Sequence, residues 1–302
     1  MIKRTLYFGN PAYLKTKNKQ LVVELVDTGE VKTAAMEDIG VLILDHQQIT
    51  ITHSVITKLL ENNVALITCN DIHHPTGLML NLDGHTLQSQ RFQLQVDASV
   101  PLKKQLWQQT VIAKITNQAH LLGQYRIANK TLLHLVSRVK SGDSDNCEAQ
   151  AANYYWKNVF PLFPGFKRAR EGEQPNNLLN YGYAILRAIV ARNLIGSGLL
   201  PTLGIFHRNQ YNAYCLADDI MEPYRPYVDK VVWEIVRTNG KFLEMTPSMK
   251  QQLLSIPAMD VIIDDEKSPL MNAVQRTTAS LAKCFEGNSR KLLYPVLPSS
   301  FS

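Results

Sequence analysis

The sequence predicts an α+β protein in which a small β domain with one short helix precedes a larger all-α domain. Two changes near residue 87 of the 302 lead to this expectation. The apolar pattern shifts there from short β-branched runs to helical spacing. Residues 1–86 carry 7 Lys and Arg against 9 Asp and Glu, whereas residues 87–302 carry 25 against 17. We therefore divide the chain into a β domain at 1–86 and a basic helical domain at 87–302.

Short apolar runs predict the strands of the first domain, and these lie at residues 5–8, 21–26, 41–44 and 64–68. The last two runs are almost wholly apolar, which is typical of strands buried on both faces. Residues 53–61 have the spacing of a short helix between them.

Apolar side chains after Pro101 fall within an arc of about 120°, which predicts an amphipathic helix. They are Trp107, Val111, Ile115, Ala119 and Leu122. Further helices are expected over 126–140, 145–159, 177–197, 209–221 and 227–238, whereas the last ten residues are too rich in Pro and Ser for a helix.

Composition argues against secretion, a membrane span and a cysteine-based site. The opening residues MIKRTLYFGN lack the apolar stretch of a signal peptide. No apolar run approaches the roughly 20 residues that span a bilayer. The four cysteines are far apart and form no CxxC pair, which favours a reducing compartment. We expect a soluble, cytoplasmic protein. The basic second domain indicates a nucleic-acid-binding surface, with a solvated surface as the equal alternative.

Glu148 heads an otherwise apolar helix face, so its carboxylate is costly to bury unless it is paired or binds a metal ion. Asp145, three residues earlier, offers another explanation, because the two form a capping-box pattern. Local sequence alone favours the cap. His207 precedes a predicted helix, and a lone loop histidine is more often structural, although imidazole also binds divalent metals.

Three carboxylates fall within five residues, at Asp218, Asp219 and Glu222. On a helix they share one face, and their repulsion favours a cation between them or a basic neighbour such as Arg225. A solvated acidic patch is the alternative. Two carboxylates and an imidazole form a ligand set suited to Mg²⁺ or Mn²⁺.

Three blocks of sequence resemble the signature blocks of the CRISPR-associated integrase family. They are NLLNYGYAIL at 177–186, GIFH at 204–207 and DDIMEPYRP at 218–226. The resemblance covers essentially the whole chain and implies that Glu148, His207 and Glu222 are the catalytic metal ligands. It also gives Asp219 and Arg225 supporting positions. The family often has aspartate at the last ligand position, and glutamate resembles its compact type II versions.

The resemblance implies an endonuclease and integrase that inserts new spacers into a CRISPR array with Mg²⁺ or Mn²⁺. A 3′-hydroxyl of the captured double-stranded DNA would attack a repeat phosphodiester. The candidate DNA-binding residues are Lys167, Arg168, Arg170, Arg187 and Arg192. Surface ion pairs are an equal alternative for the helical arginines. The implied partners are a second copy of the chain, joined through the β domain, and a small ferredoxin-like adaptation protein. The rival functions are a nuclease of branched DNA and a non-catalytic DNA-binding scaffold.

Overall fold

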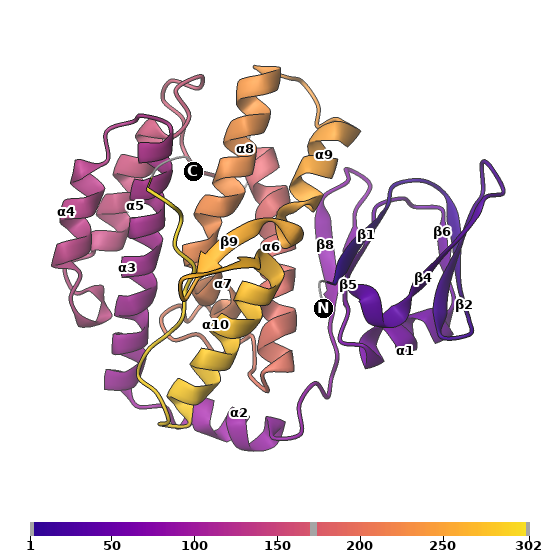
Figure 1. Ribbon diagram of the computed structural model, residues 1–302, viewed down its shortest axis with the longest axis horizontal. Helices are drawn as coiled ribbons and strands as arrows, with labels where there is room; N and C mark the ends of the chain where they lie inside the picture. The colour runs from indigo at the N-terminus through magenta and orange to yellow at the C-terminus, as the bar shows by residue number, and fades with distance from the viewer. Residues whose placement is uncertain (1–2, 170–173, 300–302) are drawn as a thin grey trace.

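Two four-stranded sheets form the N-terminal part of the computed structural model, which describes residues 3–169 and 174–299 (Figure 1). The first sheet has the order β1 (Arg4–Phe8), β5 (Ile39–Leu44), β7 (Ala65–Cys69) and β8 (Pro75–Met79). The second has the order β4 (Val31–Ala35), β3 (Gln20–Leu25), β2 (Ala12–Lys17) and β6 (Ile49–Ile51). Helix α1 (His53–Glu61) packs beside them, as its spacing predicted.

The two central strands of the first sheet, β5 and β7, are largely buried on both faces, as the apolar runs predicted. Strand β5 pairs in parallel with β1 and β7, and side chains alternate across its faces. Leu42 packs into a core that the second sheet and α1 share, whereas Val41 and Ile43 join the core of the helical part. The sheet therefore fixes the β domain against the helices.

The second part of the chain is mostly helical, so the expected α+β class is confirmed. Its helices are α2 (Gln88–Val96), α3 (Val100–Gln124), α4 (Lys130–Arg138), α5 (Cys147–Asn158), α6 (Asn176–Gly196), α7 (Cys215–Met221), α8 (Arg225–Asn239), α9 (Pro247–Leu254) and α10 (Leu270–Phe285). A hairpin, β9 (Asp260–Ile263) and β10 (Glu266–Pro269), adds two strands that the all-α expectation did not include. The boundary expected at 86/87 lies in the link between β8 and α2.

Helix α6 lies at the centre of the molecule, against α7, α8, α9, α10 and the first sheet (Figure 1). Most of its residues are buried, which agrees with its nearly continuous apolar sequence. The chain after α10 runs back along α3, where Asn117 Nδ2 donates to Pro295 O at 3.0 Å. This segment is not helical through residue 299, as expected from its Pro and Ser content.

The helix expected over 209–221 begins only at Cys215. Two asparagine side chains turn the preceding backbone: Asn209 Oδ1 accepts from Tyr211 N and Asn212 Oδ1 accepts from Tyr214 N, both at 3.0 Å. Such local bonds compete with helix formation. None of the helices in the described ranges is long and apolar enough to cross a membrane.

Candidate active site

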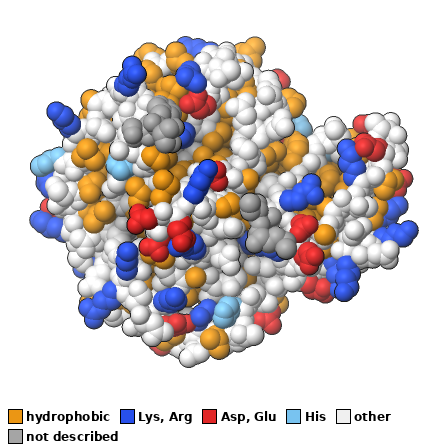
Figure 2. Space-filling view, viewed as in Figure 1, with side chains coloured by type: hydrophobic (Ala, Val, Ile, Leu, Met, Phe, Trp, Pro, Cys, Tyr) orange, Lys and Arg blue, Asp and Glu red, His pale blue; other side chains and the backbone are white. Residues whose placement is uncertain are grey.

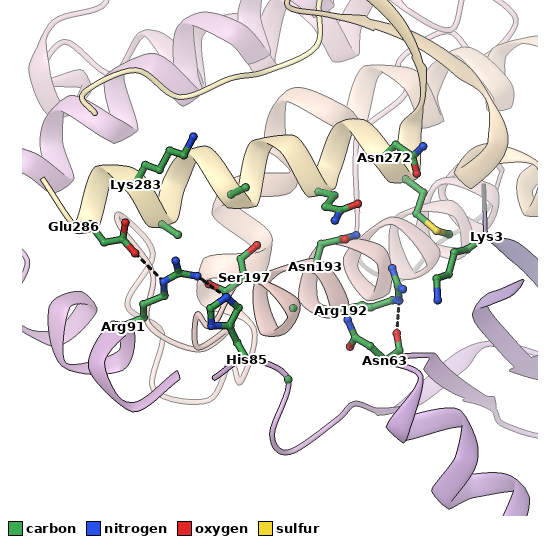
Figure 3. A pocket seen from close by; sticks show the side chains of 16 residues that line it. Lys3, Asn63, His85, Arg91, Arg192, Asn193, Ser197, Asn272, Lys283 and Glu286 are labelled. Atoms are coloured by element: carbon green, nitrogen blue, oxygen red, sulfur yellow. Dashed lines mark hydrogen bonds and ion pairs between the residues drawn. The ribbon is translucent and has the colours of Figure 1, made fainter. Parts of the chain in front are cut away.

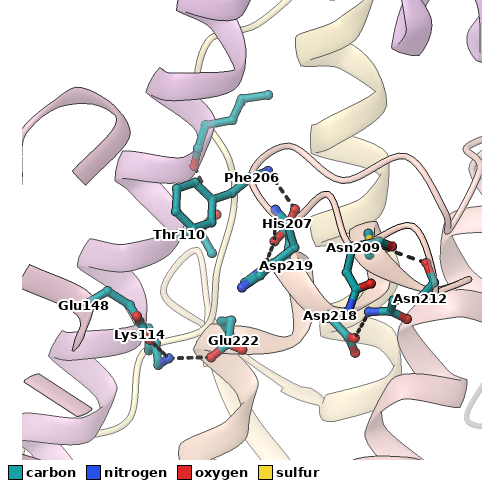
Figure 4. A network of polar contacts seen from close by, with 12 residues as sticks. Thr110, Lys114, Glu148, Phe206, His207, Asn209, Asn212, Asp218, Asp219 and Glu222 are labelled. Atoms are coloured by element: carbon teal, nitrogen blue, oxygen red, sulfur yellow. Dashed lines mark hydrogen bonds and ion pairs between the residues drawn. The ribbon is translucent and has the colours of Figure 1, made fainter. Parts of the chain in front are cut away.

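One lysine joins the two glutamates that the sequence singled out (Figure 4). Lys114 comes from the middle of α3, Glu148 from the first turn of α5, and Glu222 from the short 3₁₀ helix η3 (Glu222–Tyr224) after α7. The Lys114 ammonium contacts Glu148 Oε1 and lies 2.6 Å from Glu222 Oε2. Three segments far apart in sequence therefore meet at one buried cation.

The charges in this cluster stabilise one another. Burial disfavours the ammonium of Lys114, but the carboxylates of Glu222 and Glu148 raise its pKa above the ordinary value. Burial also disfavours the carboxylate of Glu222, yet Arg225 and Lys114 hold its pKa at about 2. Arg225 Nε lies 2.8 Å from Glu222 Oε1 in an ion pair.

Asp219 orients the imidazole of His207. Its Oδ1 lies 2.5 Å from His207 Nδ1, and its Oδ2 accepts from Phe206 N at 2.9 Å. This hydrogen bond raises the pKa of His207, whereas burial raises the pKa of Asp219. The imidazole directs its other nitrogen toward the Lys114–Glu222 pair in Figure 4. The supporting role that the resemblance implies for Asp219 stays a prediction.

The loop that carries His207 is held by close packing. The Phe206 ring stacks on the buried Trp107 ring with centroids 4.2 Å apart, and His207 meets the same indole edge-on at 5.6 Å. A Cβ added to Gly204 would lie 2.3 Å from His207 O and 2.9 Å from Asp219 Oδ2. Glycine at 204 therefore allows the backbone to fold back on itself at this point.

The capping interpretation of Glu148 is wrong. The carboxylate that caps α5 belongs to Asp143, which accepts from Cys147 N at 2.8 Å and from Glu148 N at 2.9 Å. Asp145 instead pairs with Lys140 at 2.9 Å. Because the backbone amides are already satisfied, the Glu148 side chain is free to reach Lys114.

Asp218 does not join the glutamates. Arg187 donates to it twice, at 2.7 and 3.1 Å, and Asn212 Nδ2 donates to it at 2.7 Å. Of the acidic run, Glu222 faces Lys114, Asp219 faces His207 and Asp218 faces Arg187.

The basic residues proposed to bind DNA separate into groups. Arg168, Arg187 and Arg225 line one pocket of 530 Å³. Lys167 is exposed, and Arg170 lies outside the described residues. Arg192 is not with them: it is 6% exposed and donates to Asn63 O in the β domain. It was expected on the surface beside the site, but five residues turn a helix by about 140°, so Arg187 and Arg192 project from different sides of α6. On the face in Figure 2, basic and acidic side chains are interspersed.

The donor set suits a hard divalent cation, although no three His, Cys, Asp or Glu side chains in residues 3–169 and 174–299 are clustered as a metal site. Glu148 and Glu222 already share one cation, and the Nδ1 of His207 is bonded to a carboxylate, as is usual for metal-binding histidines. The residues therefore fit Mg²⁺ or Mn²⁺ chemically, with Lys114 at the position between the carboxylates.

Sequence reasoning missed Lys114, which completes the charge balance of the cluster. It lies on α3 about 20° from Trp107 on a helical wheel, at the edge of the apolar face. A lysine at that position needs a buried acidic partner. The sequence could therefore have indicated Lys114, because Glu148 was a carboxylate on an apolar face that also needed a partner of opposite charge.

The fold, with a β domain followed by a helical domain, is similar to those of several solved structures. A casposase bound to an integration product has 18% sequence identity and a TM-score of 0.79, covering 97% of this chain and 92% of that chain. A chain of a Cas6-RT-Cas1–Cas2 complex has 19% identity and a TM-score of 0.74, covering 96% of this chain and 36% of that one. At these identities, the likeness shows the fold.

Sequence comparison identifies the family. The model for the CRISPR associated protein Cas1 matches residues 6–246. The CRISPR-associated endonuclease Cas1 of Neisseria meningitidis serogroup C is 36% identical over 303 residues, covering 99% of this chain and 98% of the relative. The chain belongs to the Cas1 family.

Proposed function

We propose that this chain is a metal-dependent integrase that joins a DNA 3′-hydroxyl to a CRISPR repeat and also cleaves DNA. The observation that carries the proposal is the convergence of Glu148, His207 and Glu222 around one buried cation position. Membership of a family whose Neisseria meningitidis relative is named an endonuclease supports it.

Glu148 and Glu222 would hold Mg²⁺ or Mn²⁺ through their carboxylates, and His207 through the ring nitrogen that Asp219 leaves free. When bound, the metal ion stabilises developing negative charge on a phosphoryl oxygen and orients the attacking and leaving oxygens. Asp219 fixes the tautomer and direction of His207. His207 is also placed to assist proton transfer to the leaving oxygen. Lys114 and Arg225 together balance the two glutamates when no metal ion is present.

The pocket lined by Arg168, Arg187 and Arg225 is the proposed place for the DNA backbone beside the metal ligands. Lys167, and Arg170 outside the described part of the chain, extend this candidate surface. Contacts of this kind position DNA without reading bases, so target choice would depend partly on DNA shape. Arg187 would exchange its ion pair with Asp218 for a phosphate.

We also propose a homodimer, joined through the β domain, in complex with a small ferredoxin-like adaptation protein in the cytoplasm. Two structural neighbours support binding to DNA and to a small partner protein. One is a casposase bound to an integration product, and another is part of a complex containing Cas2.

Integration uses a DNA 3′-hydroxyl as the attacking group and hydrolysis uses water. The assay must therefore allow both reactions. A labelled duplex with 3′-hydroxyl ends and a supercoiled plasmid carrying a repeat are incubated with Mn²⁺. Covalent transfer of the label to the plasmid supports the integrase. Cleavage of the plasmid and of branched DNA without transfer would instead favour the nuclease.

The ion pairs of Lys114 favour one rival, a non-catalytic scaffold in which the glutamates serve only to balance lysine. The variant Glu148→Ala separates these functions. Loss of cleavage and of metal binding, with DNA binding kept, excludes the scaffold. Unchanged cleavage would contradict the assigned triad.

A further inference from the structure

Arg192 is a buried cation with no acidic partner. It is 6% exposed, and its Nε donates to the backbone oxygen of Asn63. No carboxylate of the described residues forms an ion pair with it. Burial alone lowers its pKa to about 10. Buried charges in proteins are ordinarily paired, so this arginine indicates a missing anion.

Arg192 opens into a pocket of 480 Å³ at the junction of the β domain and the helical part (Figure 3). Lys3, just before β1, reaches the same end of the pocket, and no carboxylate of the part of the chain described here forms an ion pair with it. Burial lowers its pKa and the nearby positive charge of Arg192 lowers it further, whereas the charges of Asp38 and Glu37 raise it in part. Lys3 is therefore partly balanced by carboxylates, and Arg192 is the cation without an acidic partner among the described residues.

Arg91, at the opposite end of the pocket, already has its partners. Arg91 donates to Glu286 at 2.8 Å and to Ser197 O at 2.9 Å, and its NH1 lies 3.0 Å from His85 Nε2. Glu286 is the acidic residue that lines this pocket, and it is committed to Arg91. Arg91 is thus paired, whereas Arg192 at the other end has no carboxylate partner among the described residues.

The walls of this end are fixed and polar. A Cβ on Gly196 would lie 2.9 Å from Asn63 Nδ2, so the end of α6 packs closely on the chain after α1. Asn193 and Gln275 add amide groups to the lining. These groups and the guanidinium present several hydrogen-bond donors to one small volume.

We propose that this pocket binds a phosphate group. Arg192, which has no acidic partner among the described residues, and Lys3 beside it can balance the charge of a phosphate, and a guanidinium fits its oxygens in a bidentate manner. No Phe, Tyr or Trp is among the lining residues, so nothing there stacks on a base. The pocket therefore recognises the phosphate group alone and not a base attached to it, whether the phosphate belongs to DNA or to a free phosphate compound. Arg192 projects from a different side of α6 than Arg187, so this site is separate from the metal ligands.

Thermal unfolding in inorganic phosphate tests the site directly. The variant Lys3→Gln/Arg192→Gln removes both cations, and the control Lys104→Gln/Arg237→Gln removes the same charge at residues that do not line the pocket. Relative to chloride of equal ionic strength, phosphate should raise the melting temperature of wild type and control by about 2 to 4 °C more than that of the pocket variant.

Equal phosphate shifts in all three proteins would overturn the proposal, because a general salt effect is shared. If the double variant fails to fold, Lys3→Gln alone is compared with Lys104→Gln.

A DNA-binding measurement with the same variants identifies the source of the phosphate. Only this measurement rests on the proposed function. If DNA supplies it, the slope of log affinity against log salt for duplex DNA falls by about 1 to 2 in the pocket variant relative to the control. An unchanged slope together with a positive phosphate shift assigns the pocket to a free phosphate compound. Failure of wild type to bind DNA would contradict the proposed function and leave the phosphate result standing.

Discussion

Lys114 Nζ lies 2.6 Å from Glu222 Oε2 and also contacts Glu148, so one buried ammonium links the carboxylates contributed by α5 and by the segment after α7. Without it, two glutamates would face each other across a buried space. A divalent cation would relieve the same repulsion. The lysine is therefore the residue whose removal best reveals whether these carboxylates bind metal.

Lys114→Met should destabilise the metal-free protein by about 1 to 3 kcal/mol, because Glu148 loses its cation and the buried Glu222 keeps only Arg225. Mn²⁺ should restore stability, and should do so more in this variant than in wild type. Denaturant unfolding with Mn²⁺ and with a chelator measures both effects. Lys104→Met, an exposed lysine on the same helix, is the control. No recovery with Mn²⁺ would favour the scaffold.

Asp219→Asn should lower strand transfer by about 10- to 100-fold, because the carboxylate positions His207. The imidazole pKa, followed by NMR, should fall toward its ordinary value of about 6.5. In wild type the pKa is raised. The His207–Asp219 pair therefore stabilises the folded protein fully at a pH below the imidazole pKa of the unfolded chain. This contribution is lost as the pH rises through the imidazole pKa of the folded protein. An unchanged imidazole pKa and full activity in the variant would show that Asp219 has no such role.

Gly204→Ala should move the His207 loop, because the added methyl would lie 2.3 Å from a backbone oxygen. A displacement of about 1 Å at a reacting group can lower the rate about 100-fold. We expect such a loss of strand transfer with a stability loss of only about 1 to 3 kcal/mol. Steady-state rates measure the loss of strand transfer, and thermal unfolding measures the loss of stability. Wild-type transfer in this variant would mean that the loop conformation is not needed.

The sequence predicted the strands and helices whose apolar pattern is strong. Both faces of β5 are buried, and α6 is buried almost throughout, so their sequences are unambiguous. Strands such as β2 (AYLKTK) and β4 (VKTAA) carry lysines on an exposed face and gave no such signal. The β9–β10 hairpin and α10 were also not predicted, although α10 buries one clear side.

The metal-ligand assignment came from the resemblance, since local pattern favoured a cap for Glu148. The true cap, Asp143, lies before a residue with positive φ, Asn146, and this local turn is not visible from spacing alone. The partnerships of Lys114 with Glu222 and of Arg192 with Asn63 join residues more than a hundred positions apart. Such pairings depend on how the helices pack, which no local window contains.

The central claim is that Glu148, His207 and Glu222 act together on DNA through a bound metal ion. The most direct measurement is strand transfer of a 3′-hydroxyl duplex into a supercoiled repeat plasmid with Mn²⁺, comparing wild type, Glu148→Ala and His207→Ala. We predict that each variant loses transfer by at least about 100-fold while it still binds DNA. Wild-type transfer by either folded variant would contradict the account.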